Sequence, residues 1–106
     1  MMIKTTRLLA GAIMALCTLP VHAEEASPGE SLYQSQCAQC HGRAGKGSGA
    51  FPSLVGREAG YISERLEKYR AGEKVGPNSA LMRGPASRLS DEDIAALADY
   101  ISTTFQ

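Results

Sequence analysis

Hydrophobic residues recur at helical spacing in three stretches of the chain. In the last stretch, Ile94, Leu97, Ala98 and Ile101 follow the i, i+3, i+4, i+7 pattern that places side chains on one face of a helix. Ser90 precedes this stretch and is followed by acidic residues, a combination that favours a helix start. The pattern predicts an amphipathic helix that begins at Ser90.

The middle stretch predicts a second helix over residues 58–71. Ile62, Leu66 and Tyr69 are spaced to form one buried stripe. Gly72 follows at the position where helices end in a residue that tolerates positive φ.

A third helix is predicted near the start of the folded region. Ser27 is a helix-capping residue, Pro28 suits the first helical position, and Glu30 has the spacing of a capping box. The following residues then fall at three- and four-residue spacings on one side of the helix: Leu32, Tyr33, Gln36, Cys37 and Cys40. This helix therefore carries two cysteines at its C-terminal end.

Two long segments rich in glycine and proline separate the helices, over residues 42–56 and 72–89. We expect both to be loops, the second carrying Met82. Loops longer than about 12–15 residues are uncommon unless they have a function. No alternating strand-like run is present, so the fold class predicted is all-α.

Composition limits what such a fold can bury. The 106 residues include no Trp, and aromatic residues make up 6%. Three short helices joined by long loops bury too little apolar surface to offset the cost of ordering the chain, so an apolar group is expected inside. Lys+Arg and Asp+Glu both total 11, which argues against nucleic-acid binding.

The N-terminal 23 residues have the three-part plan of a secretory signal peptide. Lys4 and Arg7 precede an apolar run over residues 8–21, and Ala23 ends a small-residue cleavage site. We expect cleavage after Ala23, export to the periplasm, and a mature domain over residues 24–106. That domain has a slight acidic excess and no membrane span.

Two other readings of this segment remain open. An uncleaved membrane anchor would need an apolar run of about 20 residues, and this run is shorter. A lipoprotein would use Cys17, but the bulky Leu16 stands where a small residue is needed.

After cleavage, Cys37 and Cys40 are the only cysteines, His41 the only histidine and Met82 the only methionine. Cys37-Ala38-Gln39-Cys40-His41 is the Cys-x-x-Cys-His signature for attachment of c-type haem. Thiols one helical turn apart can each add to a vinyl group of one porphyrin, and the adjacent imidazole can bind the iron. One covalently bound haem c would supply the missing core.

Three alternatives use the same cysteines. A thioredoxin-type dithiol needs a strand-rich fold, and a structural zinc site needs four ligands where the mature chain has three Cys and His residues. A plain disulfide is compatible with export, but it explains neither His41 nor the small core.

The wider pattern resembles the class I c-type cytochromes, and most closely the small bacterial monohaem type similar to cytochromes c4, c5 and c553. The resemblance covers nearly all of the mature chain and depends on these segments: residues 29–33, 37–42, 52–56, 61–72, Met82 and 89–101. It implies an all-α fold with three main helices and long loops around the haem. It also implies that the terminal helices cross, with Gly29 and Tyr33 against Leu97 or Tyr100, and that the Pro52 carbonyl accepts a hydrogen bond from His41.

The second axial iron ligand is expected to be Met82. No second histidine remains, and Met82 is the only thioether in the position where similar cytochromes place theirs. Lys46, Lys68, Lys74 and the tyrosines are conceivable ligands outside that position, and a lone Met is often core filler. A His/Met pair raises the reduction potential and leaves no open position on iron.

These features predict a diffusible one-electron carrier, not an enzyme, that acts between redox protein partners as a monomer or weak dimer. The first alternative is a haem subunit fixed to a periplasmic dehydrogenase or sulfur-compound oxidoreductase. The second is a five-coordinate peroxidase or gas sensor, which requires that Met82 does not bind the iron.

Arg57 is expected either to pair with a haem propionate or to be a solvated surface residue. A scattered charged surface is expected around the haem edge, and a docking patch there would consist of Arg43, Lys46, Arg83 and Arg88.

Overall fold

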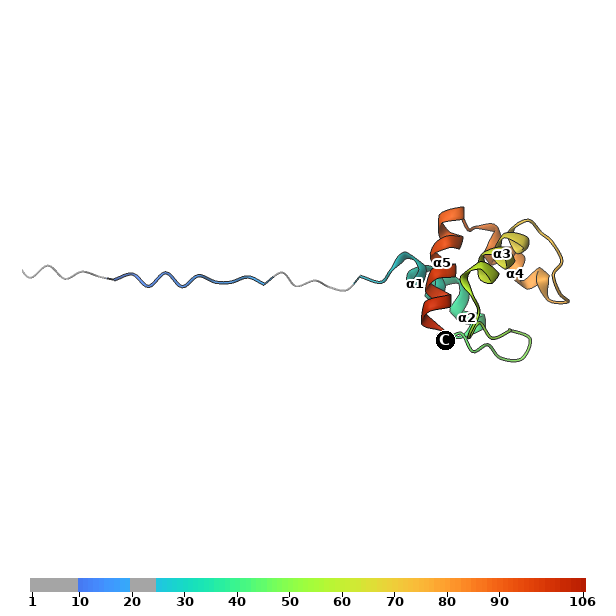
Figure 1. Cartoon of the computed structure of the whole chain (residues 1–106), viewed down its shortest axis with the longest axis horizontal. Helices are drawn as coiled ribbons and strands as arrows, with labels where there is room; N and C mark the ends of the chain where they lie inside the picture. The colour runs from blue at the N-terminus through green and yellow to red at the C-terminus, as the bar shows by residue number, and fades with distance from the viewer. Residues whose placement is uncertain (1–9, 20–24) are drawn as a thin grey trace, which may run out of the picture.

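The computed structural model describes residues 10–19 and 25–106. Residues 10–19 are exposed, have no regular secondary structure, and extend away from the folded domain (Figure 1). The predicted cleavage site after Ala23 lies outside the described residues. Within the described ranges, no helix is long and apolar enough to cross a membrane.

The domain consists of helices in the order α1 (Pro28–Leu32), η1 (Tyr33–Cys37), α2 (Ala38–His41), α3 (Ala59–Arg70), α4 (Ser79–Ser87) and α5 (Asp91–Thr104). The described residues contain no strand beyond an isolated bridge between Ser48 and Phe51. The all-α prediction is confirmed.

The local signals in the sequence set the helix ends. Ser90 and Asp93 form a complete capping box at the start of α5. Ser27 accepts a hydrogen bond from the Glu30 amide at α1, where only this half of the box is present. Gly72 has φ +80° just after α3, which confirms its expected role at that helix end.

One predicted loop is wrong in part. Residues 79–87 form α4, with Gly84 and Pro85 inside the helix. Met82 therefore lies on a helix, not in a loop. Pro85 lies in the last turn of this short helix, where the missing amide removes one hydrogen bond but does not prevent the helix.

The stretch before the cysteines also differs from a regular α-helix. Residues 33–37 form a π-helical turn, in which the Ala38 amide bonds to the Tyr33 carbonyl five residues earlier. Along this segment Tyr33 is fully buried, Cys37 is half-buried and Cys40 is exposed.

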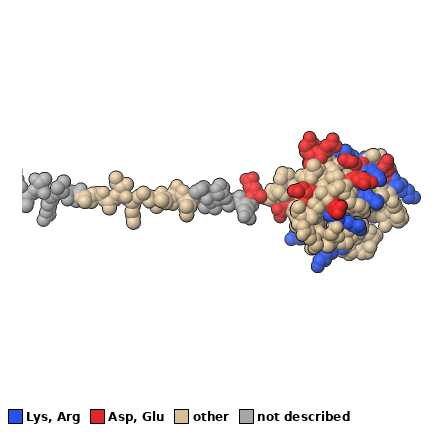
Figure 2. All heavy atoms as spheres, in the orientation of Figure 1, with Lys and Arg blue, Asp and Glu red and all other residues tan. Residues whose placement is uncertain are grey.

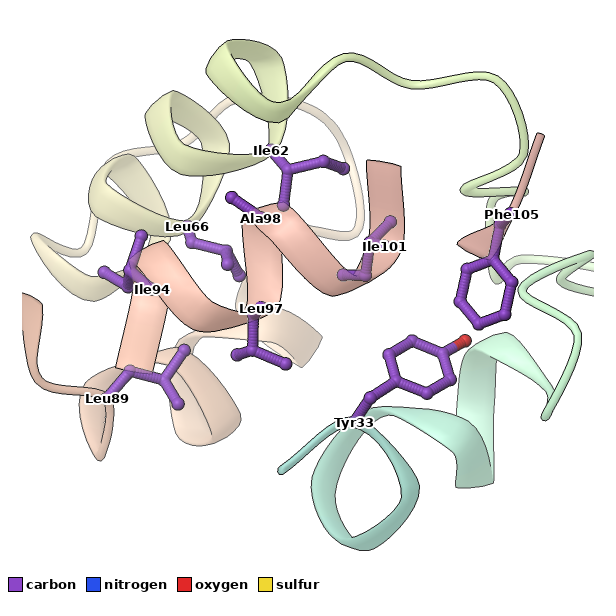
Figure 3. Close-up of a cluster of buried hydrophobic side chains, with 9 residues drawn as sticks. All are labelled: Tyr33, Ile62, Leu66, Leu89, Ile94, Leu97, Ala98, Ile101 and Phe105. Carbon is purple, nitrogen blue, oxygen red and sulfur yellow. The ribbon is translucent and has the colours of Figure 1, made fainter. Parts of the chain in front are cut away.

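The core lies where α5 meets α3 and α1. Figure 3 shows α5 side chains projecting toward these helices, with Tyr33 and Phe105 adjacent at one end. The buried cluster consists of Tyr33, Ile62, Leu66, Leu89, Ile94, Leu97, Ala98, Ile101 and Phe105. Gly29 packs directly on the α5 backbone beside Tyr100, and the Tyr33 and Tyr100 rings are 5.6 Å apart, so the implied crossing of the terminal helices is present.

Candidate functional site

The two cysteines and His41 follow one another from the end of η1 through α2. Cys37 is the last residue of η1, and Cys40 and His41 belong to α2, which ends at Gly42 with φ +84°. Tyr33 fixes this end of the helix to the core because its hydroxyl donates a 2.6 Å hydrogen bond to the Gly42 carbonyl. The helical segment that carries the motif is thereby attached to a buried residue of the core.

Burial changes the acidity of two groups in this segment. It raises the pKa of the Cys37 thiol to about 11, and the nearby Cys40 adds to the effect. Burial also raises the pKa of Tyr33 to about 12, with smaller contributions from Cys37 and Tyr100. Cys37 is therefore a neutral thiol at neutral pH in the chain without haem.

His41 is buried, and one of its two ring nitrogens is already engaged. Its Nδ1 lies 2.8 Å from the Pro52 carbonyl oxygen. A carbonyl only accepts, so Nδ1 carries the proton in this hydrogen bond and Nε2 is left with a free lone pair. The imidazole is thereby oriented as a metal-binding side chain usually is.

A glycine-rich loop brings the Pro52 carbonyl to His41. The Gly47 amide donates to the His41 carbonyl at 2.8 Å, and the Leu54 amide donates to the Gly45 carbonyl at 2.7 Å. Ser48 and Phe51 bond to each other in both directions and close the tip of the loop. The loop is built of backbone hydrogen bonds.

Met82 reaches the site from α4. The first residue of that helix, Ser79, is buried, and its Oγ accepts hydrogen bonds from the amides of Val75 and Gly76, both at 2.8 Å. The same hydroxyl donates to the Gly76 carbonyl at 2.9 Å. Ser79 thus anchors the helix one turn before Met82.

Sequence reasoning did not single out Ser79. The signal was present, because Gly-Pro-Asn-Ser precedes Ala-Leu-Met and small polar residues of this kind favour helix starts.

Two adjoining cavities, of about 310 and 90 Å³, are lined by residues of the loop and the helices. The residues lining both cavities are Cys37, His41, Pro52, Tyr69 and Met82. The larger cavity is also lined by Cys40 and Ser79, and by Gln36, whose buried side-chain oxygen has no hydrogen-bond partner among the described residues.

The donor groups fit haem c. Two thiols, one imidazole with a free nitrogen and one thioether meet at cavities with mainly apolar walls. The described residues contain no cluster of three His, Cys, Asp or Glu side chains that could hold a metal ion by themselves. The structure therefore brings four predicted site residues together, namely Cys37, Cys40, His41 and Met82.

Arg57 lines the smaller cavity. Its guanidinium lies 4.9 Å from the centre of the Tyr61 ring, and the Arg65 guanidinium lies 5.0 Å from the same ring. Arg65 also lines this cavity, so two cations flank one aromatic ring beside it.

The cytochrome c family model matches residues 26–105. This chain belongs to the cytochrome c family. It is 42% identical over 82 residues to cytochrome c-554(548) of Halomonas halodenitrificans, covering 76% of this chain and 98% of that relative. Cytochrome c4 of Thiocapsa roseopersicina is 40% identical over 90 residues, covering 74% of this chain and 46% of its own.

A solved structure agrees with these relatives. Reduced recombinant cytochrome c4 from Pseudomonas stutzeri superimposes with a TM-score of 0.64 at 33% identity, covering 74% of this chain and 47% of that one. This cytochrome thus spans about half the length of the cytochromes c4. The class I fold and covalently bound haem c as the cofactor follow from membership of the family.

Proposed function

We propose that this cytochrome is an exported one-electron carrier of the periplasm in which His41 and Met82 bind the haem iron. The observation that supports this most is that Met82 lines the same cavities as an imidazole whose Nε2 is free. Membership of the family supports the carrier function itself. Haem c, when bound, supplies reversible one-electron exchange at its iron.

The two thiols hold the cofactor. Cys37 and Cys40 would each hold the haem through a thioether, formed by addition of S–H across a vinyl double bond, which would leave no free thiol. Cys37 faces both cavities and Cys40 the larger one, which supports their attachment to a group that lies there.

The axial side chains set the redox behaviour. The Pro52 carbonyl fixes the ring of His41 and increases its basicity. Met82 would provide a soft sulfur ligand, which favours the reduced state of the iron and would leave no open coordination position. A closed site supports electron transfer and not catalysis, so we assign this chain no enzymatic activity.

Arg57 is proposed to face a carboxylate of the bound haem. Arg57 and Arg65 place positive charge at the smaller cavity, and among the described residues no acidic side chain lines either cavity. Acidic and basic side chains both occur on the face of the domain in Figure 2, and this mixture supports transient contact with redox protein partners.

Changing Met82 to Ala tests the axial assignment. We expect the oxidised wild type to show the weak far-red sulfur-to-iron absorption band and the variant to lose it. The variant should also bind carbon monoxide and have a lower reduction potential. If the band, the potential and carbon monoxide binding do not change, Met82 is a packing residue. The alternative of a five-coordinate peroxidase or gas sensor would then be supported if the wild type also bound carbon monoxide.

Export and attachment are tested on periplasmic protein. Mass spectrometry should find Glu24 at the N-terminus and one added haem, and acid-acetone should leave the colour with the polypeptide. An intact Met1 in the membrane fraction or an extractable haem would contradict the proposal. Purification as a tight hetero-oligomer would favour the enzyme-subunit alternative.

A further inference from the structure

Gly47 lies between the backbone of His41 and the carbonyl that orients the His41 side chain. Its amide donates to the His41 carbonyl oxygen at 2.8 Å. On its other side, a Cβ added at residue 47 would lie 2.7 Å from both the carbonyl carbon and the oxygen of Pro52, and closer still to the Phe51 carbonyl oxygen. Real Cβ atoms essentially never come this close to backbone atoms.

The Pro52 oxygen in this contact is the acceptor for His41 Nδ1. The acceptor therefore occupies space that any side chain at residue 47 would fill. Between Gly47 and Pro52, Ser48 and Phe51 close the turn with hydrogen bonds of 3.0 and 2.9 Å. The Pro52 carbonyl therefore cannot move away from residue 47 without opening the loop.

We propose that Gly47 is a positioning residue for the axial imidazole, an inference that rests on the proposed binding of iron by His41. Its lack of a side chain sets the distance between the Pro52 carbonyl and Nδ1. A side chain at residue 47 pushes the carbonyl away and weakens this hydrogen bond. The imidazole then becomes less basic, oxidised iron is less stabilised, and the reduction potential rises.

Gly56 provides a matched control at the end of the same loop. Gly47 and Gly56 both have positive φ, of 66° and 76°, but a Cβ at Gly56 would meet nothing within 4 Å, and Gly56 lines neither cavity. Asparagine tolerates this backbone region better than other residues. Comparing Gly47→Asn with Gly56→Asn therefore removes most of the conformational cost from both variants and leaves the steric overlap in one of them.

The test uses the reduced holoprotein and follows the Nδ1 proton of His41 by NMR. In Gly47→Asn this proton should exchange with solvent about tenfold faster than in the wild type, the factor expected for losing one hydrogen bond. The reduction potential should rise in the same variant, while Gly56→Asn should change neither quantity.

The outcomes separate this inference from the proposed function. A wild type without His/Met spectral features would contradict the axial assignment before any variant is compared. With a normal wild-type spectrum, equal exchange rates and potentials in the two variants would overturn the role of Gly47. A Gly47→Asn chain that does not retain haem would also overturn it, since Gly47 would then be needed for folding and not for positioning.

Discussion

The crossing of α1 and α5 leaves no space for a side chain at Gly29, so we predict that Gly29→Ala destabilises the protein. The new Cβ would lie 2.8 Å from Tyr100 Cβ and 2.9 Å from the Ala96 carbonyl carbon, and closer still to the Ala96 carbonyl oxygen. Two of these three atoms belong to the α5 backbone, which can yield only if the whole helix moves. Overfilling of this kind costs about 1–3 kcal/mol.

Gly60 is the matched control. Gly29 and Gly60 each occupy the second position of their helix, after Pro28 in α1 and Ala59 in α3. A Cβ at Gly60 would meet nothing within 4 Å. Gly60→Ala should therefore show only the helix-propensity gain, which is at most about 1 kcal/mol.

The assay is urea unfolding of both holoproteins, followed by far-ultraviolet circular dichroism. Gly29→Ala should lower the free energy of unfolding by about 2 kcal/mol relative to Gly60→Ala. In a domain of this size that difference lowers Tm by about 8–16 °C. If the two variants differ by less than about 0.5 kcal/mol, α1 and α5 do not cross as closely as described.

Two further substitutions test the supports of the site. Tyr33→Phe removes the 2.6 Å bond to the Gly42 carbonyl and should cost about 1 kcal/mol in urea unfolding at neutral pH. Because burial raises the pKa of Tyr33 to about 12, the folded wild type should lose stability as pH rises from 10 toward 12, a loss that the Phe variant should lack. Ser79→Ala leaves two loop amides without an acceptor, so it should lower the free energy of unfolding by about 1–2 kcal/mol and weaken the far-red band. Ser87→Ala in the same helix loses only an exposed hydroxyl contact and should change the free energy of unfolding by less than about 0.5 kcal/mol. An equal effect of the two serine variants would show that Ser79 does not hold Met82.

The helices with strong periodicity were predictable because local and tertiary preferences agree. In α5, the apolar face, the Ser90 cap and the acidic first turn all favour one helix, and its buried residues are those the pattern selects. In α3, Ile62 and Leu66 are buried as expected, while Tyr69 is half-buried because it lines the cavities.

The segment that carries Met82 was mispredicted because its local preferences conflict with its tertiary role. Gly84 and Pro85 disfavour a helix, and only Ser79 and Ala86 of α4 are buried. Packing against α3 and the hydrogen bonds of Ser79 outweigh the weak propensity. The π-helical turn before the motif was not predicted either, because the residues on this segment also fit the three- and four-residue spacing of a regular α-helix.

The two sides of the site are therefore held by different kinds of interaction. His41 is fixed by backbone hydrogen bonds of the glycine loop, which depend on conformation and on the absence of side chains. Met82 is held by one buried hydroxyl and by partial packing against the core, on a short helix with few buried residues. Free energies of local opening follow the number of buried contacts and protected hydrogen bonds. The Met82 side is the more easily opened of the two, so Met82 should leave its proposed position on the iron before His41 loosens when the protein is destabilised.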